Sequence, residues 1–363
     1  MRALVAIPAI ALIVLMLFEF FVSFLLPQRV KREARLARGI LVRLWRVWRF
    51  VATRLRGTGP DTWLGFWGPI GLLTMLATWV IGLIIGFAAL QWALDVHLAP
   101  GGGTGFRDDL YYSAGTFFSA ATDLQINGGA RGIEIAEAVC GYLVVFGVIG
   151  YLPALFQAYS RREVAVSQLD PRAGSPPSAG TLLYRSAHRG GWSDLDAYLA
   201  DWENWAAELM ETHLSYPLLA FYRSQHVNQN WLGALVTVMD TSAFAIAVAP
   251  ERTPSAEVTF AIGRHALADL AYSFRVRREE GESERLDGAT FDRLRAKLSE
   301  AGLDVAEPEE ARAKLDELRE LYEPYAEALS RRLALTLPDW VREERMENWR
   351  VTAWRTREAQ VLH

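Results

Sequence analysis

The chain has 363 residues and a formal net charge of −4, a near balance that does not favour a general nucleic-acid-binding protein. Its one cysteine, Cys140, excludes an intrachain disulfide and a cysteine-based metal site. Nearly all long apolar runs precede Ser160 and most acidic residues follow it, a division typical of a membrane half followed by a soluble half.

The N-terminal segment from Ala3 to Leu26 is apolar and has Glu19 as its one charged residue. It is long enough to cross a membrane, which takes about 20 residues of helix. A signal peptide is the alternative, but only Arg2 precedes the apolar run and no small-residue cleavage site comes before Pro27. Because a basic stretch follows, as in a stop-transfer sequence, we expect an N-terminal transmembrane helix over residues 1–27.

Residues 28–60 form a basic segment in which arginines recur and Glu33 is the one acid before Asp61. Short loops rich in Lys and Arg stay cytoplasmic, so the first span is expected to run inward and the next one outward. Apolar residues, tryptophans among them, alternate with the arginines at near-helical spacing. The pattern favours an amphipathic helix in the membrane interface over a solvated linker, with anionic lipids bound by Arg43, Arg46 and Arg49.

Two further segments are long and apolar enough to cross a membrane, at Trp63–Leu94 and Ala138–Ser160, and neither contains a charged residue. The second of them ends at Arg161 and Arg162, which fits a return to the cytoplasm. The sequence therefore predicts a multi-pass protein of the cell membrane, with residues 161–363 in the cytoplasm.

Between these two spans, residues 108–127 read DDLYYSAGTFFSAATDLQIN, and the apolar part is too short to cross a membrane. Asp108 and Asp109 suit a helix start, where carboxylates accept from free amides and oppose the positive dipole end. The helix would end near Phe118. It is either an extracellular amphipathic helix or a re-entrant one, which membranes tolerate only where it is buried in protein or lines water.

The run Tyr112-Ser113-Ala114-Gly115-Thr116-Phe117-Phe118-Ser119 resembles the pore helix of bacterial two-transmembrane potassium channels of the pore-loop ion-channel family. The stretch from Gly141 to Val164 is similar to the inner helix of that family and its cytoplasmic exit. The resemblance implies an ion-channel pore domain over 61–164, made of a transmembrane helix, a pore loop and an inner helix. It also implies a homotetramer that conducts monovalent cations, K+ or Na+.

The family filter, Thr-x-Gly-(aromatic or aliphatic)-Gly-Asp, uses glycines so that consecutive carbonyls can face the ion. Both glycines are missing here, so potassium selectivity does not carry over. Asp123 could form an acidic ring or hydrogen-bond the pore helix. The expected filter region consists of Thr116, Ser119, Ala120, Ala121, Thr122 and Asp123.

The third span contains residues that weaken a helix, and we expect it to bend there. Glycines lack helix propensity and proline lacks a backbone donor. The candidate hinge residues are Gly141, Gly147, Gly150 and Pro153.

After a Pro- and Gly-containing linker predicted at 165–185, the chain reads as an all-helical cytoplasmic domain over 186–363. The apolar run Trp231–Ala249 could be a fourth span, but a buried bundle helix is favoured because polar residues cluster at its centre. No catalytic set, metal site or cofactor motif is recognisable, and each of His188, His213, His226 and His265 is expected to be structural. The predicted helices are Ser193–Tyr216, Pro217–Gln225, Trp231–Val248, Ser255–Arg278, Gly288–Ala301, Glu307–Leu335 and Asp339–Val361.

The sequence thus predicts an all-α membrane protein: an extra N-terminal transmembrane helix, a transmembrane helix–re-entrant loop–transmembrane helix module, and a cytoplasmic helical bundle. The favoured function is a tetrameric cation channel with an atypical filter. The alternative is a non-conducting scaffold or sensor whose bundle binds a partner. A membrane-anchored enzyme is disfavoured because no site for one is recognisable.

Overall fold

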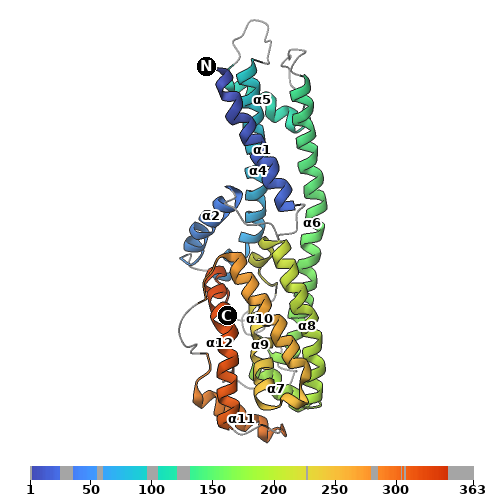
Figure 1. The fold of residues 1–363 in the computed structure, drawn as a ribbon, viewed down its shortest axis with the longest axis vertical. Coiled ribbons are helices and arrows are strands. Elements are labelled where there is room, and N and C mark those ends of the chain that lie inside the picture. The colour runs from blue at the N-terminus through green and yellow to red at the C-terminus, as the bar shows by residue number, and fades with distance from the viewer. Residues whose placement is uncertain are drawn as a thin grey trace, which may run out of the picture. The chain divides into compact units, whose positions relative to one another are not determined.

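The computed structural model describes residues 2–24, 36–54, 60–95, 105–120, 131–225, 228–278, 285–303, 305 and 308–341. Within these residues every regular element is helical, as predicted (Figure 1). The chain forms two compact units, Met1–Gln157 and Ala158–His363. The longest helix, α6, begins in the first unit and ends in the second.

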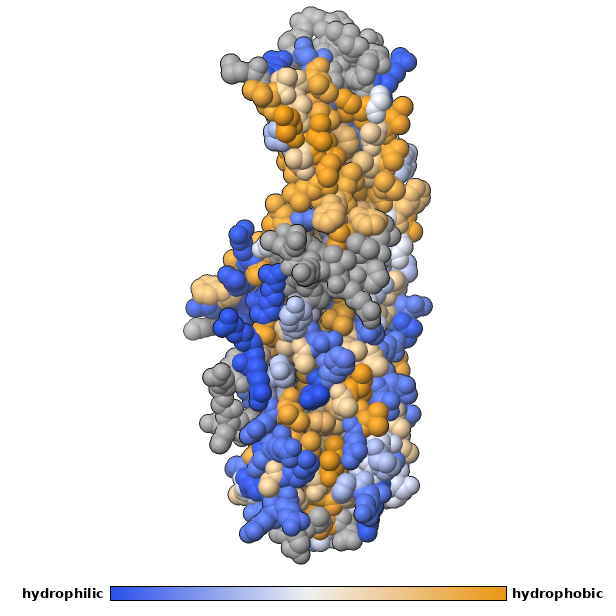
Figure 2. All heavy atoms as spheres, in the orientation of Figure 1, coloured by the Kyte–Doolittle hydropathy of each residue, from blue (hydrophilic) through white to orange (hydrophobic). Residues whose placement is uncertain are grey.

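Among the described residues four helical segments are long and apolar enough to cross a membrane: Trp231–Val248 in the second unit, and Arg2–Phe24, Thr62–Leu94 and Arg131–Ala173, which begin in the first unit. Apolar side chains dominate the visible surface of this unit, whereas hydrophilic ones are common on the second (Figure 2). The expected span at 63–94 divides at Phe66 into a short helix and a long one. The helices are η1 (Arg2–Val5), α1 (Ala6–Phe24), α2 (Leu36–Ala52), α3 (Pro60–Gly65), α4 (Trp67–Leu94), α5 (Phe106–Phe117) and α6 (Arg131–Ala173).

Helices α1 and α4 pack closely because α4 presents two glycines one turn apart, Gly82 and Gly86. A Cβ added at Gly82 would lie 2.5 Å from the Met16 sulfur, and one added at Gly86 would lie 2.7 Å from Ile13 Cγ1. Glycines spaced in this way allow the backbones of membrane helices to approach each other. The extra N-terminal helix is therefore packed against the following span as a part of the unit.

An aromatic cluster extends this packing from α1 to α6. Phe24 lies between Trp79 of α4 and Tyr151 of α6, with ring centroids 5.3 and 4.3 Å away. Phe20 contacts Trp79 edge-on at 5.5 Å, and a Cβ at Gly147 would lie 2.3 Å from its ring. The first helix thus contacts both of the later spans.

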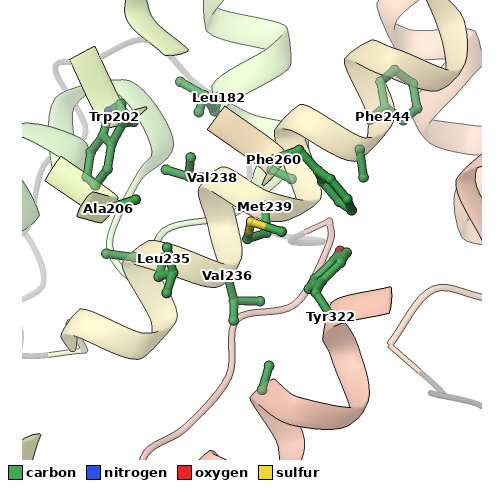
Figure 3. Packing of buried hydrophobic residues seen from close by; sticks show 14 of the residues in the cluster. Leu182, Trp202, Ala206, Leu235, Val236, Val238, Met239, Phe244, Phe260 and Tyr322 are labelled. Carbon is green, nitrogen blue, oxygen red and sulfur yellow. The ribbon is translucent and has the colours of Figure 1, made fainter. Parts of the chain in front are cut away.

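The second unit is a helical bundle built around α9. Every residue of α9 except Ile246 is buried, so its apolar character is that of a helix enclosed by protein on all sides. Figure 3 shows Leu235, Val238 and Met239 of this helix among side chains from α7, α8, α10 and α12. The elements are α7 (Ala179–Ala187), α8 (Trp192–Ser215), η3 (Pro217–Phe221), α9 (Trp231–Val248), η4 (Pro250–Arg252), α10 (Pro254–Phe274), α11 (Gly288–Glu300) and α12 (Pro308–Leu333).

The linker expected at 165–185 is mostly helix instead. Helix α6 continues to Ala173 because Leu169 and Ala173 are buried in the bundle core. It ends at Gly174, whose φ of 87° suits glycine and whose amide donates to the Asp170 carbonyl at 2.8 Å. Helix α7 already begins at Ala179, so the nonhelical connection shrinks to 174–178.

The helix expected from Asp339 is also absent at its start, since residues 335–341 are nonhelical. Trp340 is fully buried, and its carbonyl accepts from the Gly180 amide at 2.8 Å. Long-range packing of this tryptophan replaces the local preference for a helix. The remainder of that expected helix, 342–361, lies outside the described residues.

Candidate functional site

The short helix α5 lies in sequence between the spans α4 and α6, and the described contacts bring the three together. Its start is capped by Asp108, whose Oδ2 accepts from the Gly105 amide at 3.3 Å. At about 1.5 Å per residue, its 12 residues reach roughly 18 Å, well short of the ~30 Å of a bilayer core. The helix begins at Phe106 and ends at Phe117, within two residues of the expected boundaries at Asp108 and Phe118.

The C-terminal end of α5 closes in a tight turn. Ser119 has a φ of 55°, which is uncommon for a residue other than glycine. The Ser119 amide donates to the Thr116 carbonyl at 3.0 Å and the Ala120 amide to the Gly115 carbonyl at 2.8 Å, the pattern of a helix C-cap. The Ser119 hydroxyl donates to the Tyr142 hydroxyl of α6 at 3.2 Å.

The six residues of the expected filter region thus fall into three groups. Thr116 lies in the last turn of α5, and Ser119 and Ala120 lie in the exposed turn that follows. The expected filter positions Ala121, Thr122 and Asp123 lie outside the described residues.

Gly141 sets the distance between α5 and α6. A Cβ at this position would lie 2.2 Å from the carbonyl oxygen of Phe117, the last residue of α5. No side chain could occupy that space unless one helix moved. The candidate hinge residue Gly141 is thus also the position at which the end of α5 packs on α6.

The other candidate hinge residues lie within an unbroken helix. Gly147, Gly150 and Pro153 all fall inside α6, and Gly147 packs against the Phe20 ring. A Cβ at Gly150 would meet no atom within 4 Å among the described residues. Gly150 is thus the one of the three glycines whose substitution would test helix flexibility without a clash.

A buried polar cluster joins α4, α5 and α6, and sequence reasoning missed it. Glu137 Oε2 accepts from Gln91 Nε2 at 2.7 Å, and Glu137 Oε1 is hydrogen-bonded to the Ser113 hydroxyl. That hydroxyl also lies 2.9 Å from the Ile84 carbonyl oxygen. In the sequence, Glu137 directly precedes the third apolar run, and an acid at that position is normally interpreted as lying at the edge of a transmembrane span.

The basic segment contains α2, whose arginines Arg43, Arg46 and Arg49 are exposed. An exposed apolar stripe accompanies them, formed by Leu44, Val47, Phe50 and Val51. Trp45 instead packs in the protein, its ring 5.5 Å from that of Trp67. One face of α2 therefore packs against the protein through Trp45, while the apolar stripe and the arginines beside it are exposed among the described residues.

Glu19, the single acid of the first span, caps the start of α2. Its carboxylate accepts from the Leu36 amide and, at 3.1 Å, from the Ala37 amide. Carboxylates stabilise helix N-termini because free amides and the positive dipole end meet there. The charge that interrupts the apolar run thus has a structural partner.

In the second unit, His213 and Arg162 form a buried cluster. His213 Nδ1 lies 2.8 Å from the Leu209 carbonyl oxygen, and Nε2 lies 3.3 Å from the Arg162 guanidinium. Nδ1 therefore carries the hydrogen and Nε2 accepts, which is the neutral form. Burial, and then the positive charge of Arg162, lower the pKa of His213 well below its ordinary value.

Arg162 is held by several further partners. It pairs with Glu163 at 2.8 Å and donates to the Leu219 and Tyr222 carbonyls at 2.9 and 2.8 Å. These contacts fix the end of α6 to α8 and η3 inside the bundle. The expectation of a structural histidine at position 213 agrees with this role.

A second buried ionic cluster lies between α9 and α12. Arg285 pairs with Asp240 at 2.5 Å and with Glu323 at 2.8 Å, and it also donates to the Pro338 carbonyl. Tyr322 and Arg319 complete the set. Because these charged and polar groups pair with one another, we interpret the cluster as a network that stabilises the fold.

Of the other histidines, His188 contacts the Tyr184 carbonyl and His265 pairs with Asp269, while His226 lies outside the described residues. Among the described residues no group of three or more His, Cys, Asp or Glu side chains could hold a metal ion.

In comparisons with known proteins, no family model, curated protein or solved structure matches this chain.

Proposed function

We propose that the protein is a tetrameric cation channel of the cell membrane, in which α4, α5 and α6 form a pore-loop module. The observation that carries the proposal is a helix too short to cross a bilayer, packed between two that can. Its start is capped by Asp108, and Gly141 seats its end on α6. An ordinary extracellular helix would not need its last residue to touch the following span.

The proposed pore follows from the direction of α5. The C-terminal end of a helix carries a partial negative charge, which favours a nearby cation. One such helix per chain cannot enclose an axis, so four chains would bring four helix ends together. Ions would then pass the turn at Ser119 and the residues after it.

Weak selectivity among monovalent cations is part of the proposal. The sequence after Ser119 lacks the glycines that allow carbonyls to line up along an axis. A ring of four Asp123 carboxylates would favour cations over anions. Such a ring gives little basis for distinguishing K+ from Na+.

The proposed topology places the N-terminus outside and residues 161–363 in the cytoplasm, from the arginine-rich segment on the inner side. The open faces of α2 support its placement on anionic lipid there. Its apolar stripe would enter the acyl boundary, while Arg43, Arg46 and Arg49 would meet the headgroups.

A non-conducting scaffold or sensor is the second candidate, and the observation that favours it is the continuity of α6. This helix runs without a break from Arg131 to Ala173, so its last turns belong to the bundle core. A partner bound by the bundle could act on α6 whether or not ions pass.

Ion flux into liposomes that contain the purified protein separates the two candidates. The channel predicts flux of both K+ and Na+, no flux of chloride, and a smaller cation flux in Asp123→Asn. Asp339→Asn, at an exposed aspartate of the second unit, serves as the matched control. Absence of flux from a protein confirmed as a folded tetramer would refute the channel and leave the scaffold.

A further inference from the structure

Three polar side chains meet inside the apolar first unit, one from each of the helices α4, α5 and α6. Gln91 is 1% exposed, and Ser113 and Glu137 are fully buried. A glutamate within a membrane-spanning segment is costly and marks a functional position unless something neutralises it. Glu137 therefore needs either a cationic partner or a bound proton.

Counting hydrogens identifies a proton. The Ser113 hydroxyl has one hydrogen but two oxygen neighbours, the Ile84 carbonyl at 2.9 Å and Glu137 Oε1. The carbonyl can only accept, and one serine hydrogen cannot fully serve two acceptors. A protonated Glu137 gives each contact its own hydrogen, because Ser113 then donates to the Ile84 carbonyl and the glutamate donates to Ser113. Gln91 donates to the other oxygen in either case.

The described neighbours of Glu137 contain no positive charge that could stabilise an anion. Among the residues that the structure describes, no Arg, Lys or His side chain is paired with it. Its titratable neighbours are acidic or neutral: Glu134 and Cys140 on α6, and Tyr112 on α5. Gln91 and the Ile84 carbonyl, from α4, are uncharged. An ionised carboxylate in such a place loses several kcal/mol of hydration without a counterion.

We propose that Glu137 is a proton-binding site in the membrane half of the protein, and that its bound proton, donated to Ser113, joins α5 to α6. The site joins the middle of α5 to α6, and the C-terminal end of α5 packs on the same helix at Gly141. Removal of the proton would leave a buried anion near Glu134 and only the Ser113 hydrogen to serve both the carboxylate and the Ile84 carbonyl. The inference holds whether or not the protein conducts ions.

Infrared spectroscopy tests the protonation directly. The difference spectrum between the wild type and Glu137→Gln, both at neutral pH, should contain the C=O stretching band of a protonated carboxylic acid. Gln can donate to Ser113 and accept from Gln91, so this variant preserves both contacts. The matched control is Glu134→Gln, one turn away on the same helix, which should retain the acid band. A difference spectrum with only the bands of an ionised carboxylate would overturn the proposal.

The dependence of the melting temperature on pH tests whether the folded chain holds this proton. The folded chain holds a proton that the unfolded chain releases above the ordinary glutamate pKa of about 4.3. The melting temperature should therefore fall as pH rises from there until the folded chain also loses the proton. Glu137→Gln should lose this dependence, and Glu134→Gln should keep it. An equal loss of melting temperature over this pH range in Glu137→Gln and the wild type would contradict the proposal.

If Glu137→Gln does not fold, Ser113→Ala provides a second test. The acid band should persist but shift in frequency, because the acceptor of the glutamate proton is gone. An unchanged band would show that Ser113 does not receive that proton and would overturn the proposed link.

Discussion

Replacing Gly141 by alanine tests whether α6 fixes the end of α5. The new Cβ would lie 2.2 Å from the Phe117 carbonyl oxygen, and a backbone oxygen cannot rotate away. The two helices must move apart, and overpacking of this kind costs about 1–3 kcal/mol. Alanine offsets about 1 kcal/mol of that through its higher helix propensity. The expected net loss of unfolding free energy is therefore about 0–2 kcal/mol.

Gly150→Ala is the matched control, because its Cβ would meet no atom within 4 Å among the described residues. Only the propensity gain remains, so this variant should be stabilised by about 1 kcal/mol. Unfolding of both variants in detergent, followed by circular dichroism, should separate them by about 1–3 kcal/mol. Hydrogen exchange should also rise in α5 of Gly141→Ala alone. A Gly141→Ala protein as stable as Gly150→Ala would refute the close seating of α5.

Three other predictions concern charged groups elsewhere. Glu19→Ala removes the cap of α2 and should cost about 1 kcal/mol, with faster hydrogen exchange confined to the first turn of that helix; unchanged exchange there would contradict the cap. His213 stays neutral when folded while the unfolded chain takes up a proton, so stability should fall as pH drops through about 6.5, and His213→Phe should flatten that slope; an undiminished slope would oppose the assignment. Arg285→Ala leaves the buried Asp240 carboxylate without a cation, while Glu323 keeps Arg319 at 3.1 Å, and should cost about 3–5 kcal/mol in denaturant unfolding. A loss below about 1 kcal/mol would match an exposed pair instead.

Elements with strong local signals are the ones that the sequence predicts well. The range Trp231–Val248 agrees with α9 at both ends, since the Asn230 side chain accepts from the Gly233 amide at 2.7 Å as an N-cap. The short helix at α5 was also expected, from its carboxylates and its length. Apolar run length and capping residues are local properties, so they can be read from a single chain.

Features that depend on contacts between distant segments could not be predicted. Glu19 appeared as an interruption of an apolar run, and its partners lie 17 and 18 residues later in the chain. Pro171 suggested a linker, yet α6 continues past it because Leu169 and Ala173 enter the bundle core. The burial of Trp340 likewise overrode a local helix preference.

The candidate site shows the same division. The sequence placed α5 and the glycines of α6, and it made Gly141 a hinge candidate because a glycine lowers helix propensity wherever it lies. Its contact with Phe117 is visible only once the two helices are packed. Glu137 was missed because an acid at the edge of an apolar run is normally exposed. Its burial depends on the partners that α4 and α5 supply.

The structure of the purified oligomer in a lipid nanodisc, with density mapped along its symmetry axis, tests the central proposal most directly. We expect four chains, with the C-terminal ends of the four α5 helices directed toward one axis and ion density beyond Ser119. An assembly of any other size, or a tetramer in which the α5 ends face lipid, would contradict it.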